Sequence, residues 1–187
     1  MKTAPILDTE RLILRSLTLE DAADVQRLAG EYDVASTLPG IPHPYEDGMA
    51  EEWIRSCYER YETEKALDFA ITLRTDGDLI GVIGLKLDRE NERGEIGYWV
   101  GKPYWNRGYT TEAARAVVAY SFKVLKLNRI HAYHFKRNAA SGRVMEKIGM
   151  RYEGCLRQHT KRWDNFEDSM VYGILKADFD PLVPTSS

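Results

Sequence analysis

The sequence predicts an α/β (α+β) fold, in which a mixed sheet of about seven strands carries helices on both faces. Two patterns support this fold class. Short segments alternate apolar and polar residues, and longer segments place apolar residues at every third or fourth position. The two kinds of segment follow one another irregularly. The 187 residues contain no internal repeat or low-complexity block, so one domain over residues 1–187 is expected.

The chain begins with a predicted strand and a short helix. Residues 10–16 alternate, with Leu12 and Leu14 on one face of the strand. The run Thr18-Leu19-Glu20-Asp21 resembles a capping box, with Asp21 in place of the usual glutamate. A helix is therefore expected to start directly after the strand.

A loop, a second helix and a meander of strands are expected next. Residues 32–47 contain three prolines and few periodic apolar positions, which favours a loop. Residues 48–63 carry Trp53, Cys57 and Tyr61 at every fourth position, which indicates a helix. Three strands then follow: residues 69–73, 79–87 and 95–100. An Asp-Gly pair between the first two of these strands suits a hairpin turn.

The second half of the chain is expected to start with a helix that opens near Thr110. Its apolar face is formed by Ala114, Val117, Val118, Ser121, Phe122 and Leu125. Gly149 is predicted to end a second helix as its C′ residue. The remaining elements are a strand, that helix and a closing hairpin, at residues 128–135, 138–148, 151–157 and 168–175. Residues 181–187 are expected to be a loose tail.

Composition excludes several classes of partner. The formal net charge is −3, so no global basic field favours nucleic acid or an anionic membrane. No apolar run reaches the length of a membrane span, and the N-terminus lacks the pattern of a signal peptide. Two cysteines do not make a disulfide framework. A cytoplasmic location is the resulting expectation.

The most informative stretch is residues 104–113, which read Y-W-N-R-G-Y-T-T-E-A. It joins a predicted strand to a predicted helix through Arg107 and Gly108. A glycine allows close approach of the backbone to a ligand, and the first turn of a helix offers unpaired N–H groups to an anion. The stretch therefore predicts a phosphate site. Its glycine spacing matches neither a nucleotide-triphosphate loop nor a dinucleotide-binding fingerprint.

This loop is similar to the acetyl-CoA loop of the GNAT acetyltransferases, whose usual pattern is Arg/Gln-x-x-Gly-x-Gly/Ala. Aligned on Gly108, the first position is Trp105 and the last is Thr110, and both depart from that pattern. The ribosomal-protein-alanine N-acetyltransferase (Rim-type) branch has a closer version, Y-W-x-K/R-G-Y-x-T-E-A. The resemblance extends from L-D-T-E-R-L-I-L-R at residues 7–15 to E-D-S-M-V-Y-G-I-L at residues 167–175.

The resemblance implies a mostly antiparallel sheet and direct transfer of an acetyl group from acetyl-CoA to a primary amine. The implied acceptor is the N-terminal α-amine of a protein, a ribosomal protein in this branch. Main-chain N–H groups of the loop would bind the pyrophosphate, and the main chain of residues 98–100 would pair with the pantetheine arm. The implied cofactor-binding residues are Tyr98, Trp99, Val100, Asn106, Arg107, Gly108, Tyr109, Thr110, Thr111, Asn138 and Ser141. No metal is expected.

Ser141 is the expected catalytic acid. Residues 138–150 resemble the family run N-x-x-S-x-x-x-x-E-K-x-G-F/M, in which the asparagine touches the pantetheine and the serine points at the sulfur. Carried over, Asn138 binds the cofactor and Ser141 protonates the departing thiolate. Many family members use a tyrosine instead, and the sequence shows none at the matching place. Helix capping by Asn138 is the structural alternative.

Glu95 is the candidate base. An amine needs to lose a proton before it can attack, and a glutamate at the start of a strand could receive that proton through water. The alternatives are a polar residue balancing Arg93, or loss of the proton to solvent with Glu95 as a binding residue. Glu112 is expected to complement the helix dipole and pack locally rather than do chemistry. His131 and His134 lie three apart on a strand and would face opposite ways.

Two other functions stay open at this point. A small-molecule acetyltransferase would act on a polyamine, an amino acid or an antibiotic, and the lining between Leu38 and Trp53 would distinguish it. A non-catalytic acyl-CoA-binding module would keep the phosphate loop and Asn138 without turnover; the presence of Ser141 and Glu95 argues against it. A monomer and a homodimer are both compatible with the sequence.

Overall fold

The computed structural model describes residues 5–179, and its strands form one eight-stranded sheet in the order β1-β2-β3-β4-β5-β6-β8-β7. The strands are β1 (Leu7–Asp8), β2 (Leu12–Ser16), β3 (Ala66–Leu73), β4 (Leu79–Asp88), β5 (Arg93–Val100), β6 (Arg129–Phe135), β7 (Arg151–Arg162) and β8 (Asn165–Leu175). All neighbours are antiparallel except β5 and β6. The sequence count of seven omitted β1, because two residues cannot show an alternating pattern.

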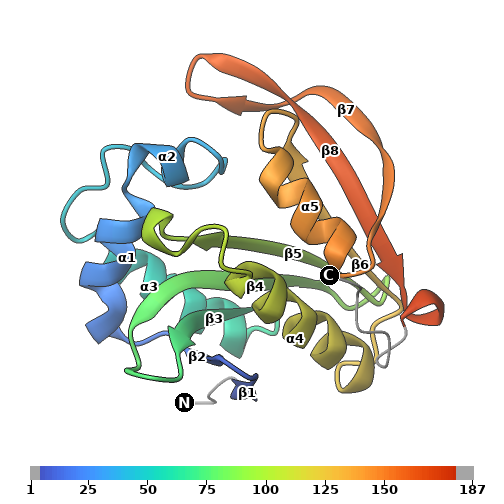
Figure 1. The fold of residues 1–187 in the computed structure, drawn as a ribbon, viewed down its shortest axis with the longest axis horizontal. Helices are drawn as coiled ribbons and strands as arrows, with labels where there is room; N and C mark the ends of the chain where they lie inside the picture. The colour runs from blue at the N-terminus through green and yellow to red at the C-terminus, as the bar shows by residue number, and fades with distance from the viewer. Residues whose placement is uncertain (1–4, 180–187) are drawn as a thin grey trace.

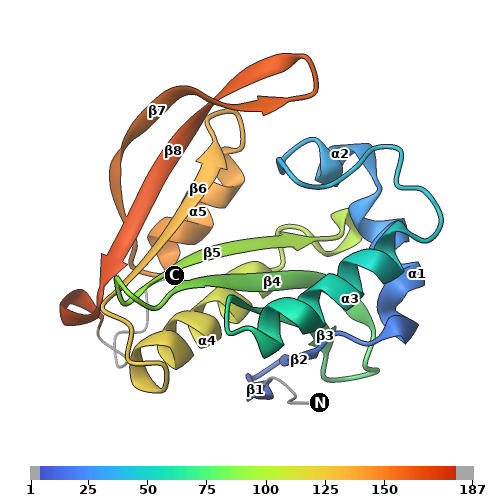
Figure 2. The same cartoon turned by 180° about the vertical axis from the view of Figure 1, so that it is seen from behind.

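Helices cover both faces of the sheet, as predicted (Figure 1 and, from behind, Figure 2). They are α1 (Ala22–Ala29), α2 (Tyr32–Ala35), α3 (Met49–Glu62), α4 (Tyr109–Lys123) and α5 (Ala139–Lys147), with three short 3₁₀ turns at Leu19–Asp21, Lys102–Tyr104 and Lys176–Asp178. α2 lies inside the stretch predicted to be loop, and its four residues are too few to show a helical period. No helix within residues 5–179 is both long and apolar enough to span a membrane.

Two apolar clusters fill the space on either side of the sheet. Alternate residues of β3 point to opposite faces, so Phe69 and Ile71 join the cluster under α4 while Ala70 joins the cluster under α1 and α3. The predicted inward face of β2 is confirmed, since Leu12 and Leu14 are fully buried. The face predicted for this helix is buried as well, apart from Leu125, which lies beyond the end of α4 and is half-buried.

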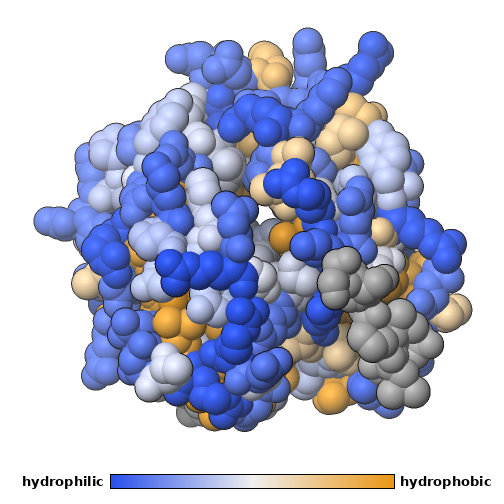
Figure 3. Space-filling model, viewed as in Figure 1, coloured by the Kyte–Doolittle hydropathy of each residue, from blue (hydrophilic) through white to orange (hydrophobic). Residues whose placement is uncertain are grey.

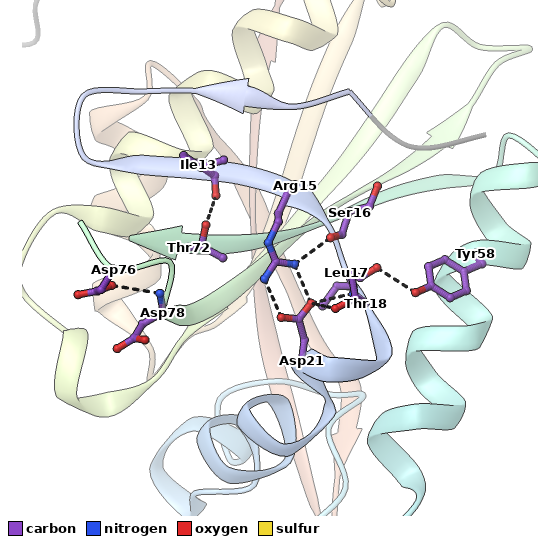
Figure 4. Close-up of polar contacts among 10 residues, drawn as sticks. All are labelled: Ile13, Arg15, Ser16, Leu17, Thr18, Asp21, Tyr58, Thr72, Asp76 and Asp78. Atoms are coloured by element: carbon purple, nitrogen blue, oxygen red, sulfur yellow. Dashed lines mark hydrogen bonds and ion pairs between the residues drawn. The ribbon is translucent and has the colours of Figure 1, made fainter. Parts of the chain in front are cut away.

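A partly buried ion pair connects β2 to the start of α1 (Figure 4). Arg15 donates from both terminal nitrogens to the Asp21 carboxylate, at 2.8 and 2.7 Å, and the Thr18 N–H donates to the same carboxylate at 2.7 Å. The predicted capping box is confirmed: Asp21 occupies its third position, and the side chain is only 7% exposed. The cap thus fixes the angle at which the chain leaves the sheet.

The sheet divides between β5 and β6. The two strands pair only between Arg93–Glu95 and Arg129–His131, whereas β6 pairs with β8 along its whole length. Residues 96–100 of β5 therefore pair with β4 on one side only. The hairpin of β7 and β8 is longer than predicted and rises away from the other strands in both views (Figures 1 and 2). The two strands therefore diverge and leave a wedge-shaped gap between them, and the candidate site lies in this wedge.

Candidate active site

Two cavities, of about 1140 and 450 Å³, meet where β5 and β6 separate. They share lining residues from three segments, namely Thr37 and Leu38, residues 96–99 of β5, and Tyr133 and His134 of β6. In Figure 3 the face that carries α5 is hollowed near its centre. Two ligands that enter different cavities would therefore meet over β5.

The smaller cavity gathers the residues predicted to bind the cofactor. Its lining includes Tyr98, Trp99, Val100, Asn106, Gly108, Tyr109, Thr110, Thr111, Asn138 and Ser141. Arg107 is the exception among the predicted residues: it is exposed and outside the lining. The remaining lining comes from α2 and the residues after it, from β5 and β6, from the segment before α4, and from α5 with the preceding Arg137.

The loop before α4 has the backbone geometry of an anion-binding site. Asn106 and Gly108 have φ values of 60° and 78°, in the left-handed region, and α4 begins directly after Gly108 without a side-chain cap. The first N–H groups of α4 consequently have no intrahelical acceptor. A Cβ at Gly108 would lie 3.4 Å from an Arg11 nitrogen, besides being strained at that φ. The loop therefore fits a diphosphate.

Fewer main-chain groups at the edge of β5 are available to a ligand than the sequence predicted. Gly101 donates its N–H to the Ile80 carbonyl of β4. Because the N–H and C=O groups of successive strand residues point to alternate sides, those of Trp99 also point to β4. The N–H and C=O groups of Tyr98 and Val100 point to the wedge. Trp105 already donates its indole N–H to the Val100 carbonyl at 2.6 Å. Tyr98 therefore offers both main-chain groups to an extended ligand.

Ser141 lies in the first turn of α5 and contacts Tyr98 across the cavity. The Tyr98 hydroxyl oxygen is 3.0 Å from Ser141 Oγ and 3.2 Å from the Ser141 carbonyl. Burial raises the pKa of Tyr98 to about 12, so this phenol stays protonated near neutral pH. The sequence showed no tyrosine at the family's usual place, but the structure brings a tyrosine hydroxyl to Ser141 from β5. Asn138 accepts from the Ser141 N–H at 3.4 Å and also caps α5.

Glu95 lines the larger cavity at the last rung before the strands part. Its Oε2 is 3.7 Å from Nε2 of His131, and its side chain is 43% exposed. The contact with His131 and the charge of Lys86 lower the pKa of Glu95 despite its partial burial. Glu95 is consequently a carboxylate near neutral pH. The suggested pairing with Arg93 is wrong, because Arg93 donates to Asp88 instead, at 2.9 Å.

The two histidines of β6 face different surroundings. His131 contacts Glu95, whereas His134 is buried, lines both cavities and places its Nδ1 2.9 Å from the Phe135 carbonyl. Within residues 5–179 no group of three or more histidine, cysteine or acidic side chains could hold a metal ion. Cys57 is buried and Cys155 is exposed, and both are free thiols.

The larger cavity has a mainly apolar wall between residues 38 and 53. That wall is formed by Leu38, Pro39, Gly40, Ile41, Pro42, Tyr45, Met49, Glu52 and Trp53. Glu52 is its single carboxylate. The lining also includes Glu95 and an ion pair between Arg60 and Asp68, whose shortest contact is 2.9 Å. An amine would thus meet aromatic and aliphatic side chains on entering.

Arg162 holds in place the segment 35–41, part of which lines this cavity, and sequence reasoning missed this role. It comes from the end of β7, is only 6% exposed, and donates to the carbonyls of Ala35, Ile41 and Pro39 at 2.5, 2.7 and 3.3 Å. Its guanidinium also lies 4.2 Å from the centre of the Trp163 ring. A basic hairpin end gives no sequence signal for such contacts, because its partners are main-chain carbonyls more than 100 residues away.

Comparisons with known proteins agree with this geometry. Residues 11–151 match the family described as an acetyltransferase (GNAT) domain. The uncharacterized N-acetyltransferase YoaA of Bacillus subtilis is 34% identical over 92% of this chain and 97% of its own length. The crystal structure of a GNAT-family acetyltransferase from Bacillus anthracis superimposes with a TM-score of 0.82, at 30% identity, over 92% of this chain and 99% of that one.

One curated relative has a named acceptor. The ribosomal-protein-serine acetyltransferase of Escherichia coli is 29% identical over 52% of this chain and 55% of its own length. The matched part therefore covers about half of each protein.

Proposed function

The chain belongs to the GNAT acetyltransferase family, and from that premise we propose that its acceptor is the α-amino group of a protein N-terminus, with ribosomal proteins as the first candidates. Membership makes it an acetyl-CoA-dependent N-acetyltransferase. The acceptor is the proposed part. The name of the Escherichia coli relative supports it, and a cytoplasmic location is part of the same proposal.

The observation that carries the proposal is the junction of the two cavities at residues 96–99. The smaller cavity holds the phosphate loop and Ser141, while the larger one holds Glu95 and the apolar wall. A polyamine or aminoglycoside site would need several carboxylates to receive several cationic groups. The larger cavity is lined by three carboxylates, of which Asp68 is paired with Arg60 and Glu95 is the proposed base. Glu52 alone is left for a further cationic group, so a peptide end with a single amine fits this lining better.

Each residue has a distinct proposed task in the transfer. The first N–H groups of α4 hold the diphosphate, and the main chain of Tyr98, with Asn138, orients the pantetheine arm. Bound acetyl-CoA supplies an acyl group that is already activated as a thioester. Glu95 then accepts the proton of the acceptor amine, directly or through water, and Ser141 donates a proton to the departing sulfur. Holding amine and thioester together makes a covalent enzyme intermediate unnecessary.

The proposal is tested by measuring thiol release from acetyl-CoA with a matched set of amines. We expect the fastest release with short peptides that begin with Ser or Ala and carry no lysine. The controls are the same peptides with a blocked N-terminus and one internal lysine, spermidine, and an aminoglycoside. Equal or faster release with spermidine or the aminoglycoside would overturn the assignment to protein N-termini while leaving the acetyltransferase intact.

A further inference from the structure

The phosphate loop and the start of α4 contact the turn between β1 and β2, which lies about a hundred residues earlier in the chain. Thr9 and Arg11, between β1 and β2, both contact Glu112 in the first turn of α4. The Glu112 carboxylate accepts from the Thr9 hydroxyl at 2.7 Å, from the Arg11 N–H at 2.8 Å and from Arg11 Nε at 2.7 Å. Sequence reasoning expected Glu112 to pack locally. Its partners instead lie about a hundred residues away.

Arg11 also contacts the loop itself. One terminal nitrogen donates to the Arg107 carbonyl at 2.9 Å, and the guanidinium lies 4.7 Å from the centre of the Tyr109 ring. Another terminal nitrogen is the atom that a Cβ on Gly108 would meet at 3.4 Å. Arg11 thus contacts the residues on both sides of Gly108 and the space directly over it.

Glu112 creates an electrostatic problem for an anion site. A carboxylate in the first turn of a helix suits the helix dipole, but it repels a phosphate bound at the same turn. Glu112 is ionised near neutral pH, because the hydrogen bonds from Thr9 and Arg11 outweigh its burial and lower its pKa. The Arg11 guanidinium, whose side chain is 44% exposed, is the cation that compensates this charge.

We propose that Arg11 is a positioning residue of the coenzyme A site, which neutralises Glu112 and holds the Arg107 carbonyl so that the turn presents N–H groups to the diphosphate. The inference rests on the proposed place of the diphosphate. It adds a requirement to that place: the Arg11 guanidinium must balance the charge of Glu112 before the loop can bind an anion tightly.

Calorimetric titration with coenzyme A tests this in a double-mutant cycle. Removing the guanidinium in Arg11→Met leaves the Glu112 charge uncompensated, so we expect affinity to fall at least about tenfold. Removing both charges in the double variant Arg11→Met/Glu112→Gln should restore most of that loss. Turnover at saturating acetyl-CoA should change little in the single variant, because Arg11 contacts neither reacting group.

Arg74 provides the matched control. It is similarly exposed, at 45%, and holds the same turn through Asp8 and the Thr9 carbonyl, at 2.7 and 2.8 Å, without contacting the loop in those bonds. Arg74→Met should bind coenzyme A like the wild type.

Three outcomes would separate the possible errors. Wild-type affinity in Arg11→Met would overturn the role of Arg11. A double variant no better than Arg11→Met, or an Arg74→Met variant equally weakened, would show that Arg11 merely supports the turn. No binding of coenzyme A by the wild type would remove the diphosphate site itself.

Discussion

At the scale of single residues, Ser141 shows that a structural role and a chemical role need not exclude each other. Its N–H belongs to the cap of α5, while its hydroxyl faces Tyr98 across the cofactor cavity. Asn138 and Ser141, on one helical turn, could be predicted because they fall within a single short run that resembles the family pattern. Tyr98 could not be connected to them, because strand β5 reaches α5 only after the whole sheet has formed.

The proposed acid and base predict separable kinetic defects. Ser141→Ala should lower kcat by about ten- to a thousandfold and leave the affinity for coenzyme A nearly unchanged, since the hydroxyl acts on the leaving sulfur.

Glu95→Gln should lower kcat most at neutral pH and less at high pH, where the amine loses its proton to solvent. Steady-state rates across a pH series, with coenzyme A titrations of both variants, check this.

Either part can fail alone. A wild-type rate for Ser141→Ala would leave Ser141 with capping only. A pH-independent defect in Glu95→Gln would make Glu95 a binding residue rather than a base.

At the scale of elements, the turn between β2 and α1 is stabilised mainly by one buried carboxylate, that of Asp21. The hydrogen bonds from Arg15 and Thr18 outweigh burial and lower the pKa of Asp21. A lowered carboxyl pKa contributes stability above the ordinary value and loses it as pH falls through the value in the folded protein. The contribution of Asp21 is therefore full near neutral pH and is lost only in acid.

Asp21→Asn should lower the free energy of unfolding by about 2–4 kcal/mol near neutral pH, because it leaves Arg15 without its charged partner. Urea denaturation measures the loss. The control is Asp24→Asn, one turn later, whose ion pair with Arg27 is largely exposed and should contribute less than about 0.5 kcal/mol. The difference between wild type and Asp21→Asn should shrink below about pH 3.8. A constant difference down to the acid limit of folding would contradict the ion-pair explanation.

Elements were predictable in proportion to the length of their patterns. The capping box, α3, α4 and the strands from β3 to β6 were found, because each repeats its period several times or carries a specific turn signal. β1 and α2 were not found, since two and four residues contain less than one informative repeat. The length of the β7–β8 hairpin was also underestimated, because bulges interrupt its alternation near Tyr152 and Leu156.

At the scale of the whole molecule, the larger cavity, which we propose takes the acceptor, depends on a distant hairpin that holds a loop in place. Arg162 bonds three carbonyls of residues 35–41, and Arg137, just before α5, donates to the Ser36 carbonyl. Those residues form one wall of the site without any regular structure beyond α2. This arrangement could not be predicted from the sequence, because the contacts are made to main-chain atoms and not to a recognisable partner side chain.

Arg162→Met should raise the KM for the peptide acceptor about tenfold while changing the affinity for coenzyme A less than about twofold. The expected reason is a loosened wall at residues 35–41, which contributes Thr37 to Ile41 to the larger cavity but only Thr37 and Leu38 to the smaller one. Lys161→Met, on the adjacent exposed position of the hairpin, is the control and should change neither constant. Thermal melting of both variants checks that the fold is intact. An equal loss of coenzyme A affinity in Arg162→Met would show that the hairpin supports the entire wedge rather than the acceptor side.

The separation of β5 from β6 has a consequence for how turnover ends. Beyond the lining that the two cavities share, each has walls of its own, so under the proposed function the acetylated peptide and the spent thiol lie in different cavities. Neither product has to wait for the other to move aside. Under that proposal a long polypeptide can depart while the nucleotide portion is still bound, which suits an acceptor much larger than the acetyl donor.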